Sequence, residues 1–158
     1  MYNTMRYDSP VGVLTLAGEG ENLVGLWLEG QKYFGAGLEL SDEGGAPALE
    51  AAKDWLDRYF AGERPAPSEL RIAPVGTAFQ RTVWAELCEI PYGETITYGE
   101  LARRLHTSAR AAGSAVGRNP ISIIVPCHRS LGADGGLTGY AGGVERKKWL
   151  LAHEGVKL

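Results

Sequence analysis

Cysteine is scarce in this chain: Cys88 and Cys127 are the only two among its 158 residues. Two cysteines are too few for a disulfide framework, and they lack the clustered Cys and His spacing of a structural zinc site. We therefore expect two free thiols, no bound metal and no other cofactor.

Long apolar runs are also absent. No stretch of about 18 apolar residues occurs, as a membrane-spanning helix would need. The N-terminal residues MYNTMRYDSPVG lack the basic and apolar segments of a secretory signal. With 44% hydrophobic residues, the composition predicts a globular protein with a substantial core. The lack of membrane-spanning and secretory segments predicts that it is located in the cytoplasm.

The chain has no overall excess of the positive charge that proteins binding nucleic acid usually carry, since its formal net charge is −3. The charge is unevenly distributed. Residues 1–74 hold 6 Lys and Arg against 12 Asp and Glu, whereas residues 75–158 hold 10 against 7. This difference predicts separate electrostatic roles for the two halves, and it leaves DNA open as a partner of the second.

Hydrophobic periodicity predicts the elements of the first half. Apolar runs at 11–16 and 23–28, separated by a Gly-rich turn, indicate an antiparallel hairpin. Residues 35–46 are expected to form a loop. Residues 47–62 begin with proline, end with glycine and have helical periodicity between them, which predicts a helix.

A linker near residues 73–77 is expected to divide the chain into two domains, 1–74 and 75–158. The first would be a small antiparallel sheet with a helix, and the second would be mostly helical. The predicted fold class is therefore α+β.

The second half contains the signals of a helix-turn-helix motif. Thr77, Thr97 and Ser108 each precede a helical run and can cap its N-terminus. The helices that begin after Thr97 and Ser108 are short and joined by a brief turn, as in helix-turn-helix proteins. A further helix is expected over residues 142–155. Its apolar residues are Val144, Trp149, Leu150 and Leu151.

Small side chains dominate the stretch from Ala109 to Gly117, where Arg110 is the only large side chain before Val116. Glycine lowers helix stability by roughly 1 kcal/mol relative to alanine, so the pattern needs another explanation. One explanation is close packing against a neighbouring helix. The other is entry of this helix into the narrow minor groove of DNA, with Arg110 projecting into the duplex.

Residues 123–129 (IIVPCHR) predict an apolar strand that ends at a proline and exposes three polar groups in a cleft. A cysteine near its ordinary pKa of ~8.5 needs a neighbouring base or positive charge to become a thiolate. Cys127 is therefore a candidate nucleophile beside His128 and Arg129. The alternative is a buried structural cysteine.

Several longer segments then point to one family. They are Pro91–Thr95, Thr97–Ala102, Ala109–Ala111, Arg118–Pro120, Val125–Arg129, Gly139–Gly143 and Trp149–Gly155. In content and order they resemble the O6-alkylguanine-DNA alkyltransferases, also called methylated-DNA–protein-cysteine methyltransferases. The resemblance implies a ribonuclease-H-like first domain that supports a winged-helix-like second domain.

The resemblance also implies a DNA repair reaction with a single turnover. O6-alkylguanine would be flipped out of duplex DNA, and its alkyl group would pass irreversibly to Cys127. His128 would deprotonate the thiol through a water, and Glu154 would orient the imidazole. Asn119 would tie the loop together, and Tyr98 would donate to guanine N3.

Further contacts follow from the same resemblance. Arg110 would replace the flipped base in the stack. The other residues implied at the minor groove are Tyr98, Ala109, Ala111, Gly113, Ser114 and Arg118. The implied substrate pocket consists of Val116, Ser130, Tyr140 and Ala141. Arg103, Arg104 and Arg129 are expected to add phosphate or stacking contacts, and the protein is expected to act as a monomer.

Two other functions remain open from the sequence. One is a lesion-binding sensor without alkyl transfer, although such alkyltransferase-like proteins replace the cysteine that is present here as Cys127. The other is a cysteine hydrolase that uses Cys127, His128 and Glu154. A hydrolase would leave the small-residue helix and Arg110 unexplained.

Overall fold

The computed structural model describes residues 2–41, 45–137 and 140–157, so Gly139 of the predicted Gly139–Gly143 segment lies outside the described residues. The chain forms two compact units. The first unit comprises Met1–Val75 and Pro120–Ser122, and the second comprises Gly76–Asn119 and Ile123–Leu158. The chain therefore leaves the second unit for three residues shortly before Cys127.

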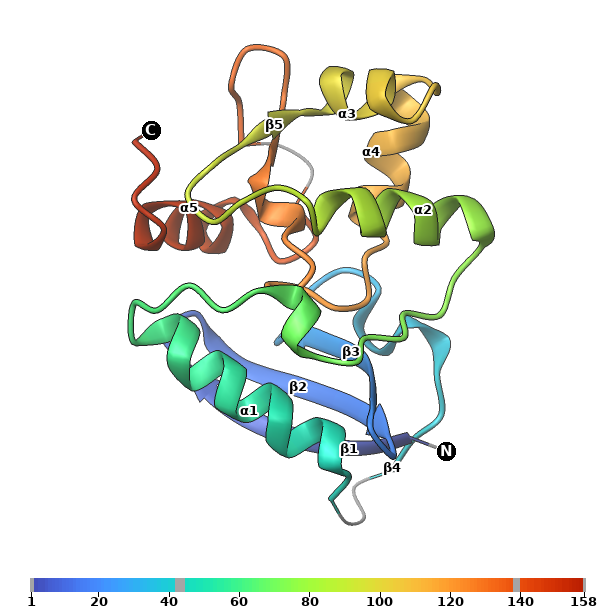
Figure 1. Ribbon diagram of the computed structural model, residues 1–158, viewed down its shortest axis with the longest axis vertical. Coiled ribbons are helices and arrows are strands. Elements are labelled where there is room, and N and C mark those ends of the chain that lie inside the picture. Colours follow the sequence, from blue (N-terminus) through green and yellow to red (C-terminus); the bar gives the residue numbers. More distant parts are fainter. Residues whose placement is uncertain (1, 42–44, 138–139, 158) are drawn as a thin grey trace. The chain divides into compact units, whose positions relative to one another are not determined.

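A four-stranded sheet forms the centre of the first unit (Figure 1). Its strands are β1 (Tyr2–Ser9), β2 (Gly12–Glu19), β3 (Asn22–Leu28) and β4 (Leu40–Ser41), in the order β3-β2-β1-β4. β4 runs parallel to β1, and the other neighbours are antiparallel. The predicted hairpin is confirmed as β2 and β3. The predicted loop at 35–46 was wrong in part, because it contains β4 and most of the short helix η1 (Phe34–Gly37).

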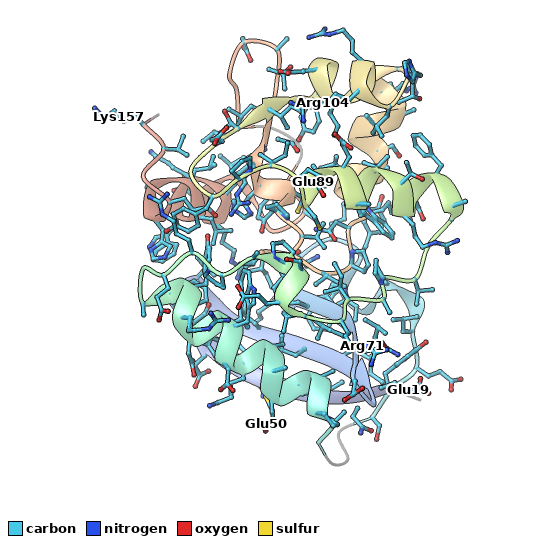
Figure 2. All side chains as sticks on the ribbon, in the orientation of Figure 1. Glu19, Glu50, Arg71, Glu89, Arg104 and Lys157 are labelled. Carbon is cyan, nitrogen blue, oxygen red and sulfur yellow. The ribbon has the colours of Figure 1, made fainter. Side chains whose placement is uncertain are left out.

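The helix α1 (Pro47–Phe60) covers one face of this sheet (Figure 1). Of the apolar face predicted for this helix, Leu49, Ala52, Leu56 and Tyr59 are buried, and Phe60 is half-buried. The N-cap, Ala46, provides no side-chain hydrogen bond. The N–H groups of Ala48 and Leu49 donate instead to the backbone carbonyls of Gly20 and Ala46, at 3.0 and 2.9 Å. Polar side chains of α1 such as Glu50 are exposed to solvent (Figure 2).

The second unit is mostly helical, with one pair of short parallel strands (Figure 1). Its elements are α2 (Ala78–Leu87), β5 (Ile96–Thr97), α3 (Tyr98–Arg104), α4 (Ala109–Gly117), η3 (Cys127–Arg129), β6 (Ser130–Leu131) and α5 (Val144–His153). Thr77, Thr97 and Ser108 cap α2, α3 and α4, each accepting a backbone N–H at 3.1 Å. These caps confirm the predicted helix starts, and the two units together confirm the α+β class.

The apolar face predicted for α5 was partly wrong. Leu150 and Leu151 are buried, but Val144 and Trp149 are exposed. Lys147 takes the buried position on this face instead, because residues 147, 150, 151 and 154 follow helical spacing. Within the described part of the chain, no helix is long and apolar enough to cross a membrane.

Candidate active site

The backbone around Cys127 is a tight turn and not the predicted end of a strand. Residues 122–124 form turns, and Ile123 is buried with a φ of 71°, which is unusual for a β-branched residue. Pro126 has φ −81° and ψ 63°, close to an inverse γ-turn, and Cys127 N donates to Val125 O at 2.8 Å. η3 follows immediately, so the prediction of a cleft-exposed thiol on a strand is replaced by a buried thiol on a turn.

Cys127 is only 4% exposed. Burial raises its pKa, because a thiolate is poorly solvated in the protein interior. A hydrogen bond from the Asn119 side chain, the charge of Lys147 and nearby backbone N–H groups act in the opposite direction. Asn119 Nδ2 also donates to Val125 O at 2.9 Å, so this residue ties the loop together while contacting the thiol.

His128 and Glu154 are both fully buried at their side chains and lie in contact, with His128 Nε2 2.7 Å from Glu154 Oε2. Burial alone would raise the pKa of Glu154, but hydrogen bonds and charge from His128 and Arg129 hold it well below its usual range. Glu154 is therefore a carboxylate, which can only accept, and Nε2 must carry the proton. Burial lowers the pKa of His128, so its Nδ1 keeps a lone pair.

Arg129 is buried against Glu154, and the predicted phosphate contact at this residue was wrong. Its Nε and Nη2 donate to the two carboxylate oxygens at 2.8 and 3.1 Å, and its Nη1 donates to Ile90 O at 2.6 Å. Gly93 N adds a bond to Glu154 Oε1 at 3.1 Å. The guanidinium thus compensates a buried negative charge that would otherwise be costly.

Lys147 is a further residue at the site, and it was not predicted from the sequence. Its side chain is fully buried, and Nζ donates to the carbonyl of Ser130 and lies 5.8 Å from the centroid of the Tyr98 ring. Burial lowers its pKa to about 8. The signal was present in the sequence, because Lys147 shares helical spacing with Leu150, Leu151 and Glu154.

Tyr98 begins α3 and is half-buried. Burial, together with the neighbouring Cys127, raises its pKa to about 12, so the phenol stays protonated at neutral pH. Gly113 of α4 lies beside it, since a Cβ at this glycine would be 3.9 Å from Tyr98 Cδ1. The first turn of α3 therefore brings a hydroxyl donor close to the thiol, next to a helix in which Arg110 is the one long side chain.

Most of the residues predicted to lie at the minor groove belong to α4 or directly follow it, whereas Tyr98 begins α3. Four of them are exposed, namely Ala109, Arg110, Ser114 and Arg118. Ala111 and Gly113 are half-buried. Arg104 is exposed at the end of α3 (Figure 2) and pairs with Glu86 and Glu100 at 3.6 and 3.4 Å. The two helices present a surface on which Arg110 is the one long side chain of α4.

The four residues predicted for the substrate pocket differ in exposure. Val116, Ser130 and Tyr140 are buried, and Ala141 is half-buried. The Ser130 carbonyl accepts from Lys147, which connects this residue to the surroundings of Cys127. Within residues 2–41, 45–137 and 140–157, no group of three or more His, Cys, Asp and Glu could hold a metal ion.

In chemical terms, the site combines a nucleophile with groups that can move its proton and stabilise its charge. A neutral imidazole is held in one tautomer by an ionised carboxylate, as in a nucleophile–His–acid triad. A buried ammonium and an amide favour the thiolate, and a phenol can donate a hydrogen bond to a departing group. The arrangement suits transfer of a group to sulfur.

Two family models match the chain. The DNA binding domain of 6-O-methylguanine DNA methyltransferase matches residues 78–156, and the ribonuclease-like domain of the same family matches residues 1–74.

Individual relatives match over nearly the whole chain. The methylated-DNA–protein-cysteine methyltransferase of Haemophilus influenzae is 45% identical over 151 residues, covering 94% of this chain and 83% of that protein. The protein of the same name from Mycobacterium tuberculosis is 48% identical over 149 residues, covering 93% and 88%. A crystal structure of Mycobacterium tuberculosis OGT in complex with DNA has a TM-score of 0.88 at 46% identity, covering 97% of this chain and 93% of that chain.

Proposed function

This chain belongs to the 6-O-methylguanine DNA methyltransferase family, and we propose that it repairs O6-alkylguanine in DNA by transferring the alkyl group to its own Cys127. The observation that carries the proposal is the contact of a buried thiol with Asn119, near the charge of Lys147 and directly before His128, whose imidazole pairs with Glu154. A buried cysteine with only a packing role would need none of these polar neighbours.

The proposed reaction is a displacement at the alkyl carbon. The Cys127 proton passes through a water to Nδ1 of His128, which makes no hydrogen bond to any other described residue. The thiolate forms a bond to the alkyl carbon, and the bond from that carbon to guanine O6 breaks, with its electron pair leaving on the base. The proton released by the thiol balances the one that guanine takes up.

Tyr98 and Lys147 support the same reaction from the side of the leaving group and the thiolate. The Tyr98 hydroxyl, protonated because its pKa is raised to about 12, can donate to guanine N3 as negative charge develops on the base. Lys147 places a positive charge near Cys127. The product is a thioether, which water does not hydrolyse under mild conditions, so each molecule would act once.

We further propose that the protein engages duplex DNA as a monomer through the minor groove. The small residues of α4 support this, because they allow a helix to approach the groove closely, and Arg110 is exposed to fill the space of a flipped base. Because the proposed substrate is DNA and the relatives from Haemophilus influenzae and Mycobacterium tuberculosis are bacterial, we propose that the protein acts in the cytoplasm of a bacterial cell.

Intact-protein mass spectrometry tests the proposed reaction. After incubation with a duplex that contains one O6-methylguanine, the protein should gain one methyl group, about 14 Da for the added CH₂. Cys127→Ser should gain nothing, whereas the matched control Cys88→Ser should gain the same mass as the wild type. Tight lesion binding without a mass gain would indicate a sensor, and repeated turnover of esters or amides would indicate a hydrolase.

A further inference from the structure

Trp84 has a contact within the second unit that side-chain packing alone does not require. It lies in α2 and is 2% exposed, and its indole Nε1 donates to the carbonyl of Ala115 in α4 at 2.8 Å. A phenylalanine could fill most of the same space without this hydrogen bond. The buried N–H therefore specifies one position of α4 against α2.

The direction of this N–H is set by the surroundings of the ring. A Cβ placed on Gly76 would lie 2.5 Å from Cη2 of Trp84 and 2.7 Å from Cζ3, so the indole rests directly on the backbone at that glycine. Gly76 immediately precedes Thr77, the N-cap of α2. The ring is thus held between the start of α2 and the end of α4.

Ala115 occupies a junction between α4 and the nucleophile. The last carbonyls of a helix have no partner within it, and Ala115 O accepts from Arg118 N at 3.1 Å as well as from Trp84. The next carbonyl, that of Val116, accepts from Asn119 N at 3.2 Å. The Asn119 side chain in turn bonds to Val125 O and to the thiol of Cys127.

From this geometry we propose that Trp84 is a positioning residue for alkyl transfer from DNA. Its indole N–H holds the C-terminal end of α4 and so sets the distance between the helix that contacts DNA and Cys127. The inference rests on the proposed function, because α4 matters only if the alkylated base reaches the thiol from a duplex bound by that helix. A misplacement of about 1 Å between substrate and catalytic group can reduce a rate about a hundredfold.

The variant Trp84→Phe tests this role, and Trp55→Phe is a matched control. Trp55 is also 2% exposed, and its indole Nε1 donates to a backbone carbonyl, that of Ala66, at 2.9 Å. It lies in α1 of the first unit. Both variants lose one indole hydrogen bond, so both should unfold at a similarly reduced denaturant concentration.

Two rates separate positioning from general stability. The first is methyl transfer from an O6-methylguanine duplex, and the second is alkylation of Cys127 by iodoacetamide, which needs no DNA and is followed by peptide mass. Trp84→Phe should lower the first rate about tenfold and leave the second unchanged. Trp55→Phe should leave both unchanged. If Trp84→Phe does not fold, replacement of Trp84 by benzothienylalanine keeps the ring size and removes only the N–H.

Other results would overturn the inference. Equal behaviour of the Trp84 and Trp55 variants would reduce Trp84 to a packing residue. A parallel loss of both rates in Trp84→Phe would mean that the indole acts on the thiol and not on the placement of α4. Failure of the wild-type protein to transfer methyl groups, with normal iodoacetamide labelling, would instead refute the proposed function and this inference with it.

Discussion

The two units differ in what they bury. The interior of the first unit is filled by large apolar side chains, among them Trp27, Trp55 and several leucines. Among the described residues, the buried polar side chains of this unit are the uncharged Gln31 and Ser122, which bond to each other at 3.2 Å. The second unit buries four acidic or basic side chains, namely His128, Arg129, Lys147 and Glu154, in addition to the thiol of Cys127.

This difference shows that the buried charged side chains are concentrated in the unit that contains Cys127. Apolar burial stabilises a fold at about 25 cal/mol per Å², whereas a buried charge is expensive unless a partner compensates it. In the second unit, the costly buried charges surround Cys127, where shifted pKa values are useful to a reaction. The first unit has the simpler task of maintaining a sheet and a helix.

The largest expected effect comes from leaving one of these buried charges unpaired. Arg129→Met should lower the free energy of unfolding by about 3–5 kcal/mol, because Glu154 then keeps a buried negative charge with less compensation. The control is Arg71→Met in the first unit, where the exposed pair with Glu21 is screened by water. Urea denaturation at neutral pH measures both.

A double variant sharpens this prediction. If charge is the cause, Arg129→Met combined with Glu154→Gln should be more stable than Arg129→Met alone. A loss in Arg129→Met as small as that in Arg71→Met would contradict the contrast between the units.

The next effect concerns a hydroxyl in each unit. Tyr98→Phe should lower the rate of methyl transfer about 10–100-fold with little change in stability, because the lost donor faces the leaving base. Tyr7→Phe in the first unit removes a hydrogen bond to Asp57 of 2.7 Å and should affect stability only. Single-turnover kinetics with a methylated duplex, together with thermal unfolding, distinguish the two. Equal rates for the Tyr98 and Tyr7 variants would argue against the assigned donor.

A smaller effect is expected for exposed arginines. Arg110→Ala should weaken binding of the duplex about tenfold and reduce the dependence of log K on log salt by up to about one unit. Arg6→Ala changes an exposed arginine of β1 and should leave both quantities unchanged. Fluorescence anisotropy in the Cys127→Ser background, at several salt concentrations, provides the measurement. An Arg6 variant that weakens binding as strongly would show that the first unit also contacts DNA.

The last effect is a change of stability with pH. Burial lowers the pKa of Lys147 from 10.5 to about 8, so between these values the unfolded chain holds a proton that the folded protein has lost. The contribution of Lys147 to the free energy of unfolding must therefore rise with pH across this window. The stability of the wild type relative to Lys147→Met should increase from pH 8 to 10.5.

The control for this prediction is Lys53→Met, at an exposed residue of α1 that pairs with Asp57. Its stability relative to the wild type should be nearly constant over the same range. A flat difference for Lys147→Met as well would mean that Lys147 is better solvated than its burial indicates.

Much of this protein could be predicted from sequence because the signals are local. Thr77, Thr97 and Ser108 mark helix starts, since a cap bonds to a backbone N–H only three residues away. The hairpin of β2 and β3 follows from alternating apolar residues around a turn. Cys127 and His128 are adjacent in the chain, so their candidacy as a reactive pair needed no tertiary structure. The strand β1 was not predicted, because its sequence, YNTMRYDS, contains few apolar residues.

Tertiary structure alone decided how the charged side chains are used. Arg129 carries the same charge as Arg110, yet it is buried because Glu154, 25 residues away, accepts its guanidinium. Trp84 finds its acceptor 31 residues away, in α4. Such pairings depend on which distant segments the fold brings together. The sequence around one residue therefore does not predict its partner. Local propensity determined the elements, and long-range contacts determined the site.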